Sequence, residues 1–421
     1  MPSNFFYWFK LLSKFVSIQL IVQAINLFVG ILIIWKLSKQ EYAYFTIANT
    51  LQSTISLLAD IGIGTSLAAL GGKIWQDKYR FGQLINTAIN LRYYLAGISV
   101  VVIVPILSWM LISNGASIRY TVLIVLFVLI GLNFQLTNTV LIVIPRLHSQ
   151  IKRIQNLDIF ISLSRLILIG LAYTTFLNTA TTIAISSIVF GLQHLFLNKW
   201  AIESIDRKAP VNSEDRGFII STIKKSLPST IFFGFQGQLN VLLISIFGST
   251  TNIAEIGALG RISVIFSLIS SIMTSIVLPA FSRCQSYEIL IKRYFQIVLS
   301  FIIFGTLLVF ICFLMPNQIL FVLGNKYSNL KNELLLMIVL TVVNSLAEMM
   351  SSFNLSKAWI DYVWIEIPLR LIIQVILLLI LDISTIRGVL ILNLISTMSP
   401  IVVNGLLTYR GLRNYKIASN I

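Results

Sequence analysis

The sequence predicts an all-α membrane protein that crosses the bilayer about twelve times. Of its 421 residues, 57% are hydrophobic and only 11% are charged, whereas a soluble globular domain carries about 25% charged residues. The mean hydropathy is +0.90. In water, a chain of this length would form two or three domains that each need a polar surface, and this composition cannot supply those surfaces.

Apolar runs long enough to span the hydrocarbon layer recur along the whole chain. The longest polar stretch, 199–225, falls midway with six runs on either side. We therefore expect an N-terminal six-helix lobe at 1–198, a cytoplasmic linker at 199–225 and a C-terminal six-helix lobe at 226–421. Because a spanning helix needs about 20 mainly apolar residues, the predicted spans are 15–35, 42–70, 88–112, 120–144, 157–178, 180–198, 226–247, 254–280, 294–315, 332–355, 362–381 and 388–408.

The basic residues are divided unequally between the two sides of these spans. Of 31 lysines and arginines, 21 lie on the side of the termini and of 199–225, and six lie on the other side. Since cytoplasmic loops carry the excess of Lys and Arg, this ratio predicts an inner-membrane protein with both termini in the cytoplasm. A net charge of +16 would suggest nucleic acid in a soluble chain, but these residues lie between apolar runs. We therefore expect no nucleic-acid partner.

Polar residues recur at helical spacing within the first, second and tenth spans, so that each set shares one helix face. Because a polar side chain that faces lipid is costly, such faces indicate a bundle interior or a water-filled cavity. Small and amide side chains can also simply hold helices together. We expect a cavity where glutamine and asparagine form the face, and helix packing at isolated serines and threonines. The three sets are Gln19, Gln23, Asn26 and Gly30; Thr46, Asn49, Ser53, Ser56, Asp60 and Gly64; and Thr341, Asn344, Glu348 and Ser351.

Three arginines lie inside predicted spans: Arg165, Arg261 and Arg370. Each costs about 2.5–3.5 kcal/mol at the bilayer centre on the insertion scale, so each needs a partner or water. Glu366 precedes Arg370 by four residues, the favourable order for a helical ion pair, and such a pair explains them as well as a substrate contact does. Arg165 and Arg261 have no carboxylate at helical spacing, which makes them candidates for binding an anion.

Single acids on the polar faces are candidates for coupling transport to an ion. Asp60, Glu348 and Glu366 could carry a proton or a cation, and Asp60 or Glu348 could instead pair with an arginine. Arg92 precedes a sufficient apolar run, Tyr93 to Ile112, so we expect its side chain to extend to the cytoplasmic edge of the membrane. Candidate hinges, which are also ordinary residues of membrane helices, are Pro105, Pro279, Pro368, Gly62 and Gly64.

Residues for catalysis or metal binding are scarce. His148 and His194 lie near predicted span boundaries without a partner at ligand spacing, and Cys284 and Cys312 form no CxxC motif. A P-loop motif is absent as well. We therefore expect no metal, no cofactor and no enzyme activity. A membrane polymerase would in addition need a large outer loop, and the largest one predicted, 316–331, holds no carboxylate.

Two segments near the second span resemble the polysaccharide transporter family. They are residues 37–45 (LSKQEYAYF) and 58–65 (LADIGIGT), and residues 255–261 (EIGALGR) resemble their counterpart in the second half of the chain. The family comprises the Wzx-type flippases, which are relatives of the multidrug and toxic-compound extruders. Where the family typically has Tyr-Gly, this chain has Tyr42-Ala43. Length, twelve spans and a midpoint loop also agree, so the resemblance extends over the whole chain.

The resemblance implies a two-lobed transporter with a cationic central cavity. It would move an undecaprenyl-diphosphate-linked oligosaccharide between leaflets of the membrane by alternating access, beside a glycan polymerase and glycosyltransferases of the same pathway. Arginines for the diphosphate and amides for sugar hydroxyls fit this function. Two alternatives remain. A multidrug antiporter of the same fold would use the acids Asp60, Glu348 and Glu366, and an O-antigen polymerase would require the outer loop that this sequence lacks.

Overall fold

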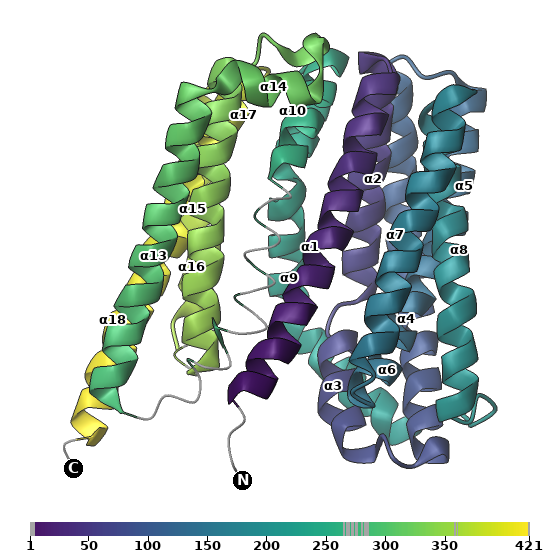
Figure 1. Cartoon of the computed structure of the whole chain (residues 1–421), viewed down its shortest axis with the longest axis vertical. Coiled ribbons are helices and arrows are strands. Elements are labelled where there is room, and N and C mark those ends of the chain that lie inside the picture. Colours follow the sequence, from purple (N-terminus) through teal and green to yellow (C-terminus); the bar gives the residue numbers. More distant parts are fainter. Residues whose placement is uncertain are drawn as a thin grey trace. The chain divides into compact units, whose positions relative to one another are not determined.

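The computed structural model describes residues 5–263 and 286–419, except 358 and 360, together with 266, 270, 273, 277, 278 and 281. Side chains are described from residue 18 to residue 414. The chain forms two compact units, which are described separately: Ala24–Ile246, and Met1–Gln23 with Phe247–Ile421. The described residues are helices joined by short connections, as Figure 1 shows.

The Ala24–Ile246 unit is a bundle of long helices in which α5 lies against α8 and α2 lies against α4. Small residues allow the close packing of α5 on α8. The Ser187 hydroxyl donates to the Phe127 carbonyl at 2.7 Å, and a Cβ on Gly131 would lie 2.5 Å from that hydroxyl. The helices are α1 (Phe5–Lys36), α2 (Lys39–Ala59), α3 (Ile63–Ile74), α4 (Lys78–Ser113), α5 (Ile118–Leu141), α6 (Val143–Leu147), α7 (Ile151–Thr174), α8 (Thr179–Ser204) and α9 (Ser213–Phe247).

The second unit contains the first part of α1 and the helices after Ile246. Its core includes an aromatic cluster in which the rings of Phe281 and Phe353 lie 4.5 Å apart, beside Tyr294. The start of α1 and the end of α18 lie at the same end of this unit (Figure 1). Its elements are α10 (Thr250–Ile262), α13 (Tyr287–Leu314), α14 (Pro316–Leu323), η2 (Asn325–Tyr327), α15 (Lys331–Ser356), η3 (Val363–Ile365), α16 (Glu366–Ile380), α17 (Ile386–Ser396) and α18 (Met398–Ser419).

The helices coincide with the predicted spans. Ten described segments are long and apolar enough to cross a membrane, and α2 with α3, which meet at a bend of 45°, make an eleventh. The remaining prediction, 254–280, begins in α10 and then falls mostly outside the described residues. The predicted all-α fold of membrane-spanning helices is therefore confirmed, and the protein is a multi-pass membrane protein.

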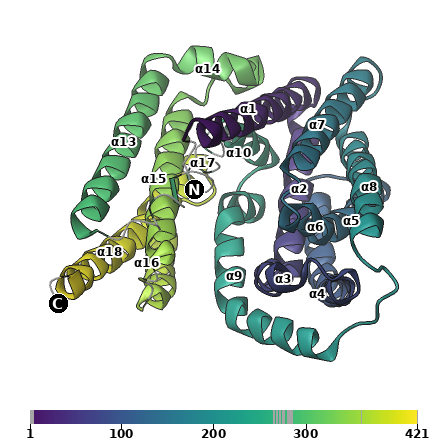
Figure 2. The ribbon, with the colours of Figure 1, turned by 60° about the horizontal axis from the view of Figure 1, so that its bottom comes forward.

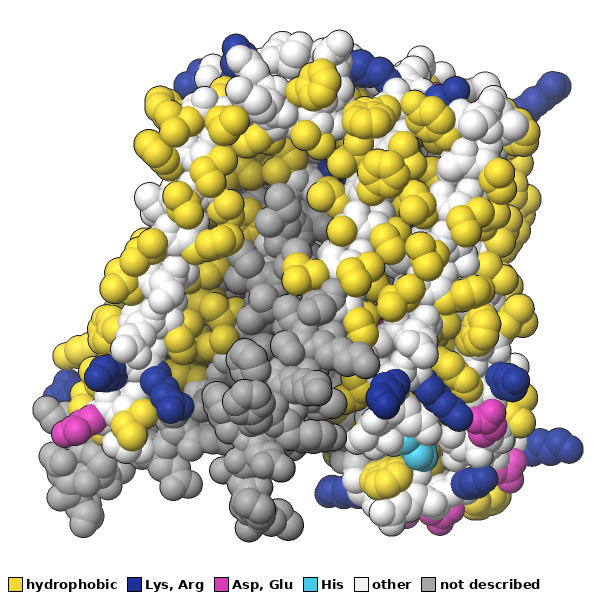
Figure 3. Space-filling model, viewed as in Figure 1, with side chains coloured by type: hydrophobic (Ala, Val, Ile, Leu, Met, Phe, Trp, Pro, Cys, Tyr) yellow, Lys and Arg dark blue, Asp and Glu magenta, His cyan; other side chains and the backbone are white. Residues whose placement is uncertain are grey.

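The outward surfaces of the helices show that lipid is the solvent. On α16, Glu366, Arg370 and Gln374 are buried, whereas Leu379 is 85% exposed and Ile380 is 72% exposed. This arrangement reverses that of a helix in a soluble protein, whose apolar face points inward. Figure 3 shows the same distribution on the visible face, with hydrophobic side chains along the helices and Lys and Arg gathered at their ends.

The 199–225 segment is mostly helical and is attached to the start of α4. The non-helical residues 205–212 lie between α8 and α9. Arg80 holds Asp215 through both oxygens, with Nη2 2.7 Å from Oδ1 and Nη1 on Oδ2. Asn86 donates to the Ala209 carbonyl at 2.8 Å. Together these contacts fix the first turn of α9 to α4.

Proline and glycine account for the irregular helices. Gly62, one of the candidate hinges, has a φ of 68° and separates α2 from α3. α9 contains Pro228, which the sequence analysis did not single out, and the helix bends visibly (Figure 2). A proline within a helix removes a hydrogen bond and causes such a bend. Pro105 lies inside the continuous α4, Pro368 lies in the first turn of α16, and Pro279 is outside the described residues.

Candidate functional site

An ion pair lies at the junction of α2 and α3. Nη1 of Arg92, on α4, is 2.8 Å from Oδ1 of Asp60. The Arg92 side chain is only 3% exposed, whereas the Asp60 side chain is 44% exposed. The pair therefore combines a buried guanidinium with a carboxylate that the protein leaves partly uncovered.

The expectation that Arg92 extends to the cytoplasmic edge is wrong. Its side chain turns inward because the carboxylate that follows the last turn of α2 lies within reach. Thirty-two residues separate the two partners in the sequence, so helical spacing could not reveal the pair. Asp60 was expected either to carry an ion or to pair with an arginine, and the structure shows the pairing. Its partner is Arg92, for which a different role was expected.

Glycine at position 62 is what brings Asp60 into place. The chain turns there with a positive φ, a conformation that residues other than glycine rarely adopt. A Cβ at Gly62 would also lie 3.0 Å from the backbone nitrogen of Ile223. The turn between α2 and α3 therefore lies directly against α9, and Asp60 faces Arg92 across the end of α2.

The polar face of α2 is divided between packing and exposure. Thr46 is buried and its hydroxyl donates to the Tyr42 carbonyl at 2.8 Å, so it serves the helix itself. Asn49 and Ser53 are exposed although they lie in the middle of a spanning helix. The Ser53 hydroxyl donates to the Asn49 carbonyl at 2.8 Å, so the exposed Asn49 amide is the group that indicates water or a polar ligand here rather than lipid. The predicted polar face is therefore present from Asn49 to Asp60.

Side-chain amides on α5 join the neighbouring helices, a feature that the sequence analysis missed. Gln52 donates to Gln135 at 3.1 Å. The Tyr93 hydroxyl donates to Asn133 at 3.1 Å. Such bonds hold spanning helices together. The signal in the sequence is the group Asn133, Gln135, Thr137 and Asn138 within a single predicted span.

Glu41, in the first family-like segment, stabilises the other end of the unit. Its Oε2 accepts hydrogen bonds from the Tyr120 hydroxyl and from the Thr179 backbone N–H, both at 2.7 Å. A carboxylate at a helix N-terminus satisfies donors that have no partner within the helix, and it interacts favourably with the helix dipole. Glu41 therefore links α2, α5 and the start of α8.

The other predicted residues of this unit and of α1 are half-buried. Arg165 on α7 lies near α8, where its Nη2 is 3.4 Å from the Ser186 hydroxyl. Gln19, Gln23 and Asn26 are all half-buried on α1. Arg261, also half-buried, belongs to the second unit, so a joint role with Arg165 stays a prediction.

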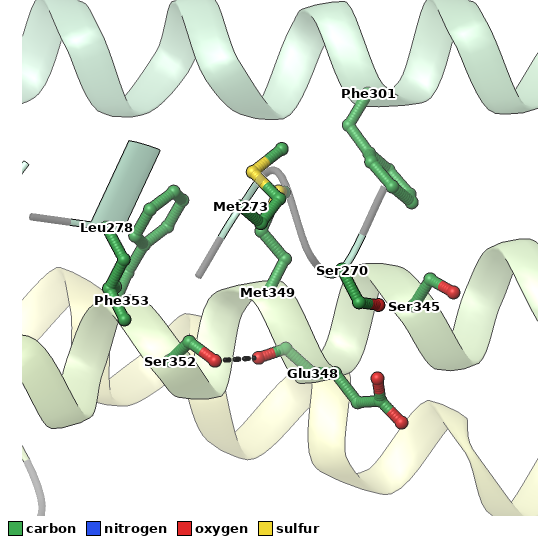
Figure 4. Close-up of a pocket in the computed structure, with 9 residues that line it drawn as sticks. All are labelled: Ser270, Met273, Leu278, Phe301, Ser345, Glu348, Met349, Ser352 and Phe353. Atoms are coloured by element: carbon green, nitrogen blue, oxygen red, sulfur yellow. Dashed lines mark hydrogen bonds between the residues drawn. The ribbon is translucent and has the colours of Figure 1, made fainter. Parts of the chain in front are cut away.

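A small pocket in the second unit is bordered by Glu348. Its volume is about 80 Å³, which is enough for ordered water. Glu348 is exposed, and Figure 4 shows its carboxylate directed away from Met273 and Phe301. The pocket is lined by Ser270, Met273, Leu278, Phe301, Ser345, Glu348, Met349, Ser352 and Phe353.

The remaining residues of the tenth-span face make helix contacts. The Thr341 hydroxyl is 2.8 Å from the Ser263 hydroxyl, and the Thr397 hydroxyl donates to Asn344 at 2.9 Å. Glu366 and Arg370 lie one turn apart, both buried on the inner face of α16. In the described part of the chain, no group of three His, Cys, Asp or Glu side chains is placed to hold a metal ion.

Comparison with known proteins identifies the fold. No family model matches the sequence, and no match among curated proteins is significant. Solved structures match over nearly the whole chain. The inward-facing conformation of a multidrug resistance MATE family transporter of the MOP superfamily has a TM-score of 0.74 at 19% identity, covering 96% of this chain and 99% of that one.

Two further structures agree. The outward-facing conformation of a multidrug resistance MATE family transporter has a TM-score of 0.65 at 18% identity, covering 96% of this chain and 95% of that one. A MOP superfamily transporter from Pyrococcus furiosus, described as having a binding pocket of reverse polarity that suggests a different function, has a TM-score of 0.62 at 18% identity, with the same coverage. The chain therefore has the MATE-type fold.

Proposed function

We propose that this chain, which has the fold of MOP superfamily transporters, flips an undecaprenyl-diphosphate-linked oligosaccharide from the cytoplasmic to the periplasmic leaflet of the inner membrane. In this proposal both termini are cytoplasmic and transport proceeds by alternating access coupled to an ion. The flipped product would pass to a glycan polymerase, and glycosyltransferases would supply the substrate.

The observation that carries the proposal is the exposed polar face of α2. Asn49 and Ser53 are exposed within a spanning helix, and the half-exposed Asp60 carboxylate lies beyond them. Such a face needs water or a polar ligand at membrane depth. An oligosaccharide presents many hydroxyl groups, and amide and hydroxyl side chains can bond them as donors or acceptors. The lipid chain of the same molecule can remain in the bilayer.

The charged residues supply the other functions that the substrate requires. Arg165, Arg261 and Arg370 are the residues proposed to bind the diphosphate, because arginine presents several donors to phosphate oxygens. Asp60, Glu348 and Glu366 are proposed to carry the coupling ion. At Asp60 a proton would neutralise the carboxylate and weaken its contact with Arg92, so that protonation and local structure are linked.

The decisive experiment measures flipping of a fluorescent lipid-linked oligosaccharide in proteoliposomes. The test variant combines Asn49→Leu with Ser53→Ala, which removes polar groups from the exposed face. Two lost hydrogen bonds to the substrate, each contributing about 0.5–1.5 kcal/mol, predict a fall in the flipping rate of about tenfold. Thr46→Val, a buried change on the same helix, is the control and should flip at the wild-type rate. Equal rates in all three proteins would contradict the proposal.

A multidrug antiporter is the second candidate, favoured by the exposed carboxylates of Asp60 and Glu348. Such a protein would exchange a lipophilic cation for protons, and Asp60→Asn would abolish that exchange. Cation exchange that depends on Asp60, together with glycolipid flipping that does not respond to the α2 variants, would establish this candidate over the flippase.

A further inference from the structure

An apolar groove runs between α2, α4 and α9 within the Ala24–Ile246 unit. Its volume is about 410 Å³, within the range of about 300–1,000 Å³ typical of ligand pockets. Thr54 and Ser99 are its polar lining residues. The lining residues are Leu51, Thr54, Leu58 and Ile61 on and after α2; Leu95, Ile98, Ser99, Val102, Ile103 and Ile106 on α4; and Leu227, Ile231, Phe235, Leu242 and Ile246 on α9.

The groove is a built feature of the unit. One side is closed where α9 meets α2, because a Cβ at Gly234 would lie 2.6 Å from Cδ2 of Leu57. The α4 side remains open, with Ile98 66% exposed and Val102 57% exposed. At membrane depth an open apolar groove is filled by hydrocarbon rather than by water, because water would gain almost no hydrogen bonds there.

The length of the groove matches one leaflet of the bilayer. On α4 the lining residues run from Leu95 to Ile106, and on the α2 side from Leu51 to Ile61. At 1.5 Å per residue these walls are about 15–17 Å long, which is roughly half of a hydrocarbon layer of about 30 Å. The α9 wall continues further, to Ile246. A chain enclosed by all three helices therefore has the length of a phospholipid acyl chain.

A positive charge lies one helical turn before the groove. Lys224 is exposed and precedes Leu227 by three residues, so it shares the face of α9 on which Leu227 lies. The neighbouring Lys225 is also exposed, but it points about 100° away from that face. Lysine at a membrane surface attracts anionic lipid, and an ammonium group binds phosphate oxygens.

We infer that the groove between α2, α4 and α9 binds one acyl chain of an anionic phospholipid, whose phosphate is held by Lys224. The lipid is a resident of the leaflet on the side of residues 199–225. This inference goes beyond the proposed function and does not depend on which substrate the protein carries.

Photo-crosslinking tests the inference on the full-length protein. The protein is reconstituted into phosphatidylethanolamine vesicles that contain phosphatidylglycerol with a photoreactive group in its acyl chain. We expect crosslinks in the peptides that span Leu95–Ile106 and Leu227–Ile246. A matching phosphatidylcholine probe should label these peptides less. Equal labelling by both probes, or labelling elsewhere on the protein only, would overturn the inference without any variant.

Paired variants then test each part of the site. Lys224→Gln should lower labelling by about fivefold, the effect of one lysine near an anionic surface, and Lys225→Gln should leave it unchanged. Val102→Trp should fill the groove and abolish labelling, whereas Val101→Trp, on the same helix outside the groove, should not. Equal effects within either pair, or displacement of the probe by an equimolar polyprenyl phosphate, would refute a phospholipid site. If the protein proves unable to flip glycolipid but is still labelled, the proposed function is refuted and the lipid site is not.

Discussion

Breaking the Asp60–Arg92 pair from each side in turn should have unequal effects on stability. Asp60→Asn leaves a guanidinium that is 3% exposed without its anionic partner. A hydrogen bond to a charged group contributes about 1.5–3 kcal/mol, and the loss is greatest when a buried charge remains. We therefore expect Asp60→Asn to destabilise the protein by about 1.5–3 kcal/mol.

Replacing Arg92 should destabilise the protein less than replacing Asp60. Arg92→Met removes the buried charge and leaves a carboxylate that is 44% exposed, which water can solvate, so we expect a loss below about 1 kcal/mol. Because methionine fills a similar volume, the core around α4 stays packed. The double variant should resemble Arg92→Met alone, since the buried charge is then gone as well.

The assay measures the melting midpoint of each protein in detergent. The midpoint is read from the fraction of protein that stays monodisperse after heating. All three variants and the wild type are compared in one detergent and at one pH. If Arg92→Met proves the more destabilising single change, or if the two single effects simply add, then the buried arginine is not held by Asp60 and the reasoning fails.

Two further predictions concern the contacts that place α9. Gly62→Ala should lower the melting midpoint by the equivalent of about 1–2 kcal/mol, because the residue has a φ of 68° and the added Cβ approaches Ile223. Gly97→Ala is the control and should not lower the midpoint, because the space around Gly97 is open. Equal effects of the two variants would contradict the close approach at Gly62. Asp215→Asn should release residues 205–212 to limited proteolysis, because it removes the bidentate partner of Arg80. Glu214→Gln, an exposed neighbour, should leave the cleavage rate unchanged, and rapid cleavage of both variants would show that the ion pair is not what holds the segment.

The positions of the helices could be predicted because each one depends on local composition. A run such as Tyr93 to Ile112 is long enough to cross a bilayer whatever surrounds it, and the turn at Gly62 follows from the conformational freedom of glycine. The extension of α9 back to Ser213 could not be predicted in this way. It depends on Arg80 and Asp215, which lie 135 residues apart in the sequence.

The candidate site was predictable only in part, for the same reason. The polar face of α2 follows from helical spacing, and the structure divides it into the buried Thr46 and the exposed Asn49 and Ser53. Spacing along one helix carries no information on the partner helix, so the role of Arg92 was misjudged. The amides of α5 were missed because each finds its partner on another helix.

The reversed polarity of α16 has a consequence for how the protein is made. α16 leaves the ribosome before α17 and α18, against which it packs, so Glu366 and Arg370 enter the membrane before the surfaces that later bury them exist. A charge at the bilayer centre opposes insertion by about 2.5–3.5 kcal/mol, and Arg370 lies closer to the centre of this span than Glu366 does. We therefore expect α16 to partition into lipid together with α17 and α18, so that the last three helices enter the membrane as one unit.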